Sequence, residues 1–337
     1  MIQIGIIGAG RIGKVHGESI SRYVKGAKLK AIADPFLNDS IRKWAADTGI
    51  PCVTDDYHKI LEDPEIDAVL ICSSTDTHAQ ISIEAIRAGK HVFCEKPIDH
   101  SLSRIQKVVD ELAKSNVKYQ VGFNRRFDHN FRAVRDTVAA GKIGEPHILK
   151  ITSRDPNPPT PEYIKVSGGM FLDMTIHDFD MARYLLNSEV TEVYAAGTVL
   201  VDPAIGKAGD IDTAIVTMKM EDGALAVIDN SRKAAYGYDQ RAEVFGSKGQ
   251  VAVSNDTAST AVLSGEDGVT AEKPLYFFLE RYMQAYAEEI NRFVDAIVND
   301  KPVSPNADDG LKAVLIAAAA KKSCEEHRPV RLSEITY

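Results

Sequence analysis

The hydrophobic pattern of the first third of the chain alternates between short apolar runs and stretches of helical periodicity. Apolar runs rich in β-branched residues occur at residues 2–7, 29–33, 68–72, 91–94 and 118–121. Helix-like segments follow the first run as far as residue 23 and occupy residues 77–88 and 101–114. Strands that alternate with helices predict a doubly wound α/β domain with a parallel sheet.

The pattern changes from about residue 122. A helix-like stretch at 127–140 is followed by β-like runs near 146–153, 192–201, 212–220, 224–231, 240–245 and 249–254. Turn signals such as Glu221-Asp222-Gly223 predict a large open sheet that is mostly antiparallel, and helices at about 278–299 and 309–326 make this an α+β domain. We therefore predict domains at 1–121 and 122–337. An uncovered sheet face commonly packs on another subunit, so we expect a homo-oligomer.

The bulk properties exclude several classes of protein. A chain of 337 residues exceeds the usual size of one core, and 44% hydrophobic with 26% charged residues is ordinary for a soluble globular protein. The net charge of −8 has no basic cluster, which argues against nucleic acid or an anionic membrane as partner. Without a signal segment or an apolar span, we expect a cytoplasmic protein. The cysteines lack CxxC pairing and a histidine at metal spacing, so we predict no metal and four buried thiols: Cys52, Cys72, Cys94 and Cys324.

A glycine-rich loop follows the first predicted strand. In Gly8-Ala9-Gly10-Arg11-Ile12-Gly13, the first glycine allows the tight turn, Gly10 lets the backbone approach a pyrophosphate, and Gly13 lets the helix pack close to the strand. Asp34 ends the second strand, where the ribose-binding acid of a Rossmann domain belongs. No Arg or Lys follows to meet a 2′-phosphate, which favours NAD over NADP. The alternative is that Asp34 only caps the next helix.

Ligands of such sheets bind beyond the carboxyl ends of the strands. That rule places Glu95-Lys96-Pro97 at the cofactor crevice, and Lys96 becomes a candidate proton donor or electrostatic anchor. Most lysines are solvated surface residues, so Lys96 considered alone favours neither a functional role nor a surface position. The other predicted cofactor-binding residues of this edge are Ser73, Ser74, Thr75, His78 and Glu95.

The run 168–182 has an unusual distribution of polar groups. Asp173, His177 and Asp180 stand at i, i+4 and i+7 in an otherwise apolar segment, so a helix here would place all three on one face. Burial of a carboxylate beside an imidazole is costly, and chemistry on a bound ligand is one reason to tolerate it. A structural Asp–His hydrogen bond is the alternative.

Further polar groups gather in the second domain. They lie in Asn124-Arg125-Arg126-Phe127-Asp128, in the run from Ser153 to Pro159, in Tyr236-Gly237-Tyr238-Asp239 and in Glu280-Arg281-Tyr282. Each alone fits a surface or salt-bridge role. Together they favour a polyhydroxylated ligand over an apolar one.

These motifs give the chain a family resemblance. The glycine loop, Glu95-Lys96-Pro97 and Gly168-Gly169 with Asp173 and His177 resemble the Gfo/Idh/MocA oxidoreductases over essentially the whole chain. The runs 122–128, 173–180 and 236–241 are similar to those of the inositol 2-dehydrogenases.

The resemblance implies a function and roles for residues. It implies that an NAD-dependent tetramer oxidises a cyclitol, with a hydride leaving ring carbon C2 for C4 of the nicotinamide. Lys96, Asp173 and His177 match the family's catalytic set: His177 as general base, Asp173 as its orienting acid and Lys96 as donor to the developing oxyanion. The Lys96–Pro97 bond is often cis in the family. Substrate-binding positions would be Lys96, Arg126, Asp155, Asn157, Asp173, His177, Asp180, Tyr236 and Tyr282.

Two departures leave the stereoisomer, myo- or scyllo-inositol, open. Ser73-Ser74-Thr75 stands where some inositol dehydrogenases carry an aromatic, and the run 153–159 varies between branches. The alternatives are another sugar or polyol dehydrogenase of the superfamily, or a non-catalytic NAD-binding sensor.

Overall fold

The chain consists of two compact units. The structure, a computed structural model, describes residues 1–336. One unit contains Met1–Phe127 and Met283–Val314, and the other contains Asp128–Tyr282 and Leu315–Thr336. The chain therefore returns to the first unit at Met283 and re-enters the second unit at Leu315. The division predicted at residues 121/122 stays a prediction.

The first unit contains a six-stranded parallel sheet in the order β3-β2-β1-β4-β5-β6. This is the strand order of a doubly wound dinucleotide-binding domain, so the predicted Rossmann sheet is confirmed. The strands are β1 (Ile2–Ile7), β2 (Ala27–Ala33), β3 (Cys52–Thr54), β4 (Ala68–Ile71), β5 (His91–Cys94) and β6 (Tyr119–Val121). The helices are α1 (Arg11–Tyr23), α2 (Asp39–Thr48), α3 (His58–Glu62), α4 (Thr75–Arg87), α5 (Leu102–Leu112), η1 (Asn124–Phe127) and α12 (Met283–Val298).

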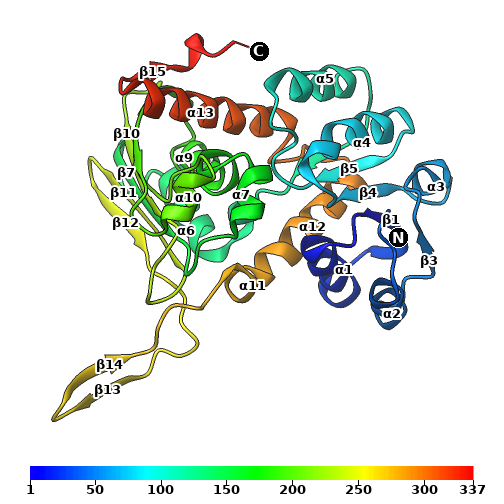
Figure 1. Cartoon of the computed structure of the whole chain (residues 1–337), viewed down its shortest axis with the longest axis horizontal. Coiled ribbons are helices and arrows are strands. Elements are labelled where there is room, and N and C mark those ends of the chain that lie inside the picture. The colour runs from blue at the N-terminus through cyan, green and yellow to red at the C-terminus, as the bar shows by residue number, and fades with distance from the viewer. Residues whose placement is uncertain (337) are drawn as a thin grey trace. The chain divides into compact units, whose positions relative to one another are not determined.

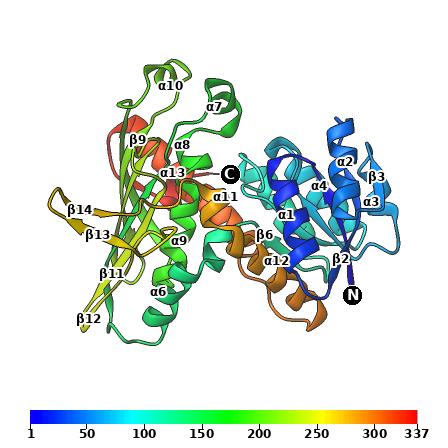
Figure 2. The same ribbon diagram turned by 90° about the horizontal axis from the view of Figure 1, so that it is seen from below.

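The parallel strands are apolar because helices cover both faces of their sheet. Ile4 and Ile6 are fully buried, and α4 packs beside α5 while α1 packs beside α12 (Figures 1 and 2). The late helix α12 supplies Ile290 and Phe293 to the same core cluster as the β1 side chains. The first unit therefore needs residues from near the end of the chain to complete its core.

The second unit contains a seven-stranded sheet in the order β12-β11-β7-β10-β9-β8-β15. All neighbouring pairs are antiparallel except β7 and β10, which confirms the mostly antiparallel prediction. The strands are β7 (Pro146–Arg154), β8 (Val190–Thr198), β9 (Thr213–Met220), β10 (Leu225–Ser231), β11 (Asp239–Gly246), β12 (Gly249–Val253) and β15 (Val330–Arg331). A separate hairpin of β13 (Val262–Gly265) and β14 (Gly268–Ala271) projects from this unit (Figure 1).

Helices lie on one face of this seven-stranded sheet. Figure 2 shows α6 (His129–Ala139) and α9 (Ile176–Leu186) on the same side. The side chains of β9 alternate between buried and exposed, as expected when one face is covered. Large apolar side chains are exposed on the strands at Ile148, Tyr194, Ile215, Leu225 and Phe245. The remaining elements are α7 (Pro161–Ser167), α8 (Met170–Asp173), α10 (Pro203–Lys207), α11 (Phe278–Arg281), α13 (Ala307–Glu326) and η2 (Leu332–Glu334).

The expectation that the run 168–182 could form one helix is wrong. α8 ends at Asp173 and α9 begins at Ile176, so Asp173 and His177 belong to different helices. The Thr175 hydroxyl donates to Asn230 at 2.7 Å and also lies 3.3 Å from the carbonyl oxygen of Met170. Side-chain bonds of this kind compete with regular helix bonding. The predicted helix 278–299 is likewise divided into α11 and α12, at Tyr282.

The prediction of four buried thiols is also wrong in part. Cys72 and Cys94 are buried, but Cys52 is exposed and Cys324 is partly exposed. Cys52 opens β3, the three-residue edge strand, which has a neighbour on one side only. Among residues 1–336 no helix is both long and apolar enough to cross a membrane.

Candidate active site

The glycine loop has the backbone that its sequence predicts. Gly8 has φ of +105°, and a Cβ there would lie 2.6 Å from the Cys72 carbonyl. A Cβ on Gly13 would lie 2.0 Å from the Gly8 carbonyl oxygen, so α1 packs against the loop too closely for any side chain. At Gly10 nothing lies within 4 Å, and no side chain caps α1 within the described part of the chain. The amide groups at the start of α1 therefore face space that a pyrophosphate fits.

Asp34 connects this loop to the end of β2. One carboxylate oxygen accepts from the Ala9 amide at 2.7 Å, and the other accepts from the Phe36 amide at 2.8 Å. The N-cap of the following helix is Asn38, whose side chain accepts from the Ile41 amide. Asp34 therefore shapes the loop and is not the helix cap. Its predicted contact with a ribose stays a prediction.

His78 joins two turns at the carboxyl edge of the first sheet. Its ring nitrogens lie 2.9 Å from the Pro97 carbonyl oxygen and 3.0 Å from that of Ser73. Both nitrogens can satisfy these acceptors only as donors, which requires the imidazolium form. Burial by itself lowers the pKa of His78, but the interactions with Cys94 and the two carbonyls outweigh it and raise the pKa to about 9. His78 thus fixes the turn after Cys72 against the turn that contains Lys96.

The turn after β5 places Lys96 at a strand end, as predicted. The Lys96–Pro97 peptide bond is cis, which agrees with the resemblance. Lys96 is partly exposed, and its backbone amide donates to the Glu95 carboxylate at 3.2 Å. A second Glu95 oxygen lies 2.7 Å from Nε2 of His16, so Glu95 is anchored within its own unit.

In the second unit Asp173 belongs to a buried ion-pair group. The guanidinium of Arg232, which is 4% exposed, donates to Asp173 at 3.0 Å and to Asp155 at 3.3 Å. The Tyr163 hydroxyl donates to the other Asp173 oxygen at 2.9 Å. Burial lowers the pKa of Arg232, but the two carboxylates outweigh burial and raise it. Arg232 therefore links two of the predicted substrate-side residues.

His177 lies between two residues that a single buried asparagine binds. The Asn230 side chain accepts from the Thr175 hydroxyl at 2.7 Å and donates to the Asp178 carboxylate at 3.0 Å. Asn230 and Asp178 are 2% and 0% exposed. Since residues 175 and 178 flank His177, these bonds to β10 fix the position of the His177 backbone at the start of α9.

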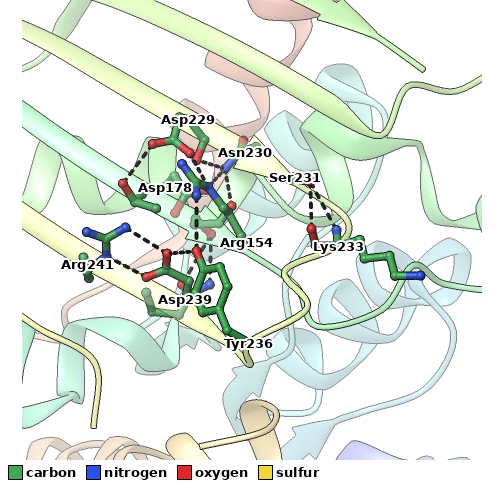
Figure 3. Close-up of polar contacts among 12 residues, drawn as sticks. Arg154, Asp178, Asp229, Asn230, Ser231, Lys233, Tyr236, Asp239 and Arg241 are labelled. Carbon is green, nitrogen blue, oxygen red and sulfur yellow. Dashed lines mark hydrogen bonds and ion pairs between the residues drawn. The ribbon is translucent and has the colours of Figure 1, made fainter. Parts of the chain in front are cut away.

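Tyr236 joins a third polar group, which Figure 3 shows beside the ends of β7 and β11. Its hydroxyl donates to Asp239 at 2.5 Å and accepts from Arg154 at 3.2 Å. Burial and the Asp239 carboxylate raise the pKa of Tyr236. Arg154 also pairs with Asp229 at 2.6 Å. The exposed Asn157 donates to the Tyr276 hydroxyl.

Three other predicted substrate-binding side chains are buried. Arg126 pairs with Asp309 at 3.1 Å within the first unit. Asp180 is 1% exposed and lies 4.0 Å from Arg183, and Tyr282 is 1% exposed against the ring of Tyr238. These are packing contacts and ion pairs within each unit. The roles of Arg126, Asp180 and Tyr282 in substrate binding stay predictions.

Sequence reasoning missed Arg232, Tyr163, Asn230 and Asp178. Arg232 follows β10 directly, and Asp155 follows β7 directly. The two strands are parallel and Ser231 pairs with Arg154, so both charged residues emerge at the same edge. The sequence shows a charged residue after each of these strands, but it does not show that the two strands pair in parallel.

The comparisons with known proteins identify the family. A model described as "Oxidoreductase family, NAD-binding Rossmann fold" matches residues 2–123, and one described as "GFO/IDH/MocA C-terminal domain" matches residues 131–252. The chain belongs to the Gfo/Idh/MocA family of oxidoreductases. As a member of this family it is an NAD-dependent oxidoreductase, and the open glycine loop fits that cofactor.

Individual relatives cover nearly the whole chain. It is 50% identical over 334 residues to the myo-inositol 2-dehydrogenase of Thermotoga maritima, with 99% of each chain covered. It is 45% identical over 333 residues to an inositol 2-dehydrogenase of Rhizobium meliloti, covering 98% of this chain and 99% of that one. The solved scyllo-inositol dehydrogenase from Lactobacillus casei, with bound NAD(H) and scyllo-inositol, has a TM-score of 0.92 at 33% identity, with 99% of both chains covered.

Proposed function

We propose that this protein is an inositol 2-dehydrogenase that oxidises a ring secondary alcohol of myo-inositol to the keto-inositol, with NAD as hydride acceptor. The observation that supports this most is the match of 50% identity along the full chain to a myo-inositol 2-dehydrogenase. The group Asp155–Arg232–Asp173 adds a structural argument, because buried charged donors and acceptors suit a ligand with many hydroxyl groups.

The bound cofactor would supply the hydride acceptor. The residues that bind it are proposed to be the glycine loop for the pyrophosphate and Asp34 for the ribose. His78 acts there through the two turns that it joins.

The chain's own residues are proposed to manage the alcohol proton. His177 Nε2 or Nδ1 accepts the proton as general base, and Asp173 orients and stabilises the imidazolium. Lys96 donates to the oxygen on which negative charge develops, which lowers the barrier most effectively where water is excluded. Arg232 keeps Asp173 as an oriented carboxylate.

A substrate panel tests this proposal. NADH formation at alkaline pH is measured with myo-inositol, scyllo-inositol, glucose and xylose, each with NAD and with NADP. We expect turnover of myo-inositol with NAD. Turnover of glucose or xylose without any inositol would refute the substrate, and no turnover of any alcohol alongside NADH binding would favour a sensor.

A variant pair tests the proposed catalytic set. Lys96→Ala should abolish turnover while NADH binding, followed by fluorescence, survives. Lys107→Ala is the matched control, because Lys107 is an exposed lysine of α5 in the same unit. A fully active Lys96→Ala enzyme would contradict the mechanism.

The assembly and location are also proposals. We propose a cytoplasmic homotetramer, in which the exposed apolar side chains of the seven-stranded sheet pack against another copy. Light scattering coupled to size-exclusion chromatography measures the mass directly, and a monomer at micromolar concentration would contradict the assembly.

A further inference from the structure

Three ionisable side chains meet inside the first unit, and none of the proposed steps uses them as acids or bases. They are His16 of α1, Glu95 after β5 and Glu289 of α12. The side chains of His16 and Glu289 are 0% exposed, and that of Glu95 is 11% exposed. His16 Nε2 lies 2.7 Å from Glu95 Oε1 and 4.0 Å from Glu289 Oε1. A helix from near the end of the chain thus brings a second carboxyl group to the His16–Glu95 pair.

Glu289 lacks the partners that a buried carboxylate requires. Neither of its oxygens has a hydrogen-bond partner among residues 1–336. Burial, and then the Glu95 carboxylate, raise the pKa of Glu289 well above its usual range. The nearby Cys72 thiol brings no charge, because burial and then the Glu95 carboxylate raise its pKa as well. An unpaired buried anion is far more costly than the neutral acid.

The ligand atoms of the same three side chains all lie within 4.8 Å of one another, a spacing that also suits a metal ion. Two observations favour a proton instead. His16 Nε2 already makes a hydrogen bond to Glu95, and His16 Nδ1 has no hydrogen-bond partner in the described part of the chain. Metal-binding imidazoles almost always donate from the second nitrogen to a supporting acceptor.

We infer that Glu289 is kept as a neutral acid, which leaves Glu95 as the single anion of this cluster, and that Glu95 is a positioning residue for Lys96. One Glu95 oxygen bonds His16, and the other accepts from the backbone amide of Lys96 at 3.2 Å. A Cβ on Gly122 would lie 2.8 Å from the Glu95 carboxylate, so the glycine provides the space that Glu95 occupies. The benefit to Lys96 rests on the proposed function, whereas the charge state of Glu289 does not.

The charge state is tested by Glu289→Gln, which copies the shape of the neutral acid and cannot ionise. A carboxyl group whose pKa is raised in the folded state contributes to stability below its ordinary pKa of about 4.3. That contribution is lost as the pH rises toward the folded-state pKa. The ratio of folding constants, variant over wild type, should therefore grow by up to tenfold for each pH unit above about 5. Glu288→Gln is the matched control, since Glu288 is the adjacent residue of α12 with a 32% exposed side chain paired to Arg292.

Denaturant unfolding at pH 5, 6, 7 and 8 gives this ratio for each variant. A ratio that rises with pH for Glu289→Gln and stays flat for Glu288→Gln supports the neutral acid. A Glu289→Gln protein that is destabilised equally at every pH would overturn it. Stoichiometric zinc or manganese in the purified wild-type protein, lost in Glu289→Gln, would overturn it in favour of a metal site.

The positioning role is tested by Glu95→Gln in steady-state kinetics. The amide keeps the size of the side chain but cannot accept from both His16 and Lys96 as a charged group. We expect kcat to fall by at least tenfold while KM and the dissociation constant of NADH stay within twofold. Weakened NADH binding with unchanged kcat would instead make Glu95 a cofactor contact and refute the positioning role. If no inositol is turned over, the unfolding experiment still decides the charge state.

Discussion

Removal of the buried Arg232 guanidinium should have a large effect on both stability and activity. Arg232→Met keeps an unbranched side chain but leaves Asp155 and Asp173 without their shared cation. Breaking a buried ion pair costs about 3–5 kcal/mol. The two carboxylates are 14% and 12% exposed, and Asp173 still accepts from Tyr163, so we take the lower end, about 3 kcal/mol. For a unit of this size that lowers Tm by roughly 6–12 °C.

The assay combines thermal unfolding with steady-state kinetics. Asp173 would lose its orientation in Arg232→Met, and a displacement of about 1 Å near the chemistry costs on the order of 100-fold in kcat/KM. Lys150→Met is the control, because Lys150 makes a surface pair with Glu243 at 3.0 Å and its side chain is 60% exposed. Such pairs contribute at most about 1 kcal/mol. Equal Tm values for Arg232→Met and Lys150→Met, or full activity of folded Arg232→Met, would contradict this prediction.

Four further variants, three in the first unit and one at Tyr236, have expected outcomes. Gly10→Ala should fold normally, since nothing lies within 4 Å of the new Cβ, but it should bind NADH at least tenfold more weakly. Gly13→Ala should be unstable, because its Cβ would lie 2.0 Å from a carbonyl oxygen. Equal NADH affinity of Gly10→Ala and wild type in a fluorescence titration would contradict this. Because the pKa of His78 is raised in the folded state, protonation of His78 contributes about 3 kcal/mol to the free energy of unfolding. This contribution is complete below pH 6.5 and is lost as the pH rises to about 9. In denaturant unfolding, the free energy of unfolding of His78→Gln should not show this decrease between pH 6.5 and about 9. A decrease as steep as that of the wild type would contradict the imidazolium form. Tyr236→Phe should raise KM for inositol with little change in Tm, and an unaltered KM removes Tyr236 from the substrate site.

Local sequence signals predicted most of the Rossmann half of the fold, although β3, α2 and α3 were not among the predicted elements. The strand, glycine loop and helix of residues 1–23 lie next to one another in sequence, and the parallel order follows from repeated alternation. The candidate residues at the strand ends, such as Lys96, were predictable for the same reason: their location depends on the end of one strand and on a general rule for parallel sheets.

The second unit was less predictable because its polar groups depend on long-range pairing. Asp155 and Arg232 meet because β7 and β10 run parallel within an otherwise antiparallel sheet. The interruption of the run 168–182 depends on Asn230, a residue of β10 that accepts from Thr175. Likewise nothing near residue 16 or 95 indicates that Glu289 joins them. Side chains that are distant in sequence decide these features, and periodicity cannot report them.

The late contribution of α12 to the first unit has a consequence for how the protein is synthesised. The ribosome completes all six strands of the parallel sheet by residue 121, but Ile290 and Phe293, which complete the core, emerge only after residues 128–282. At about 5–20 residues per second, that interval lasts on the order of ten seconds or more. During it the nascent first unit exposes an apolar surface, which a chaperone can bind. A gene truncated after residue 127 would leave that surface uncovered permanently.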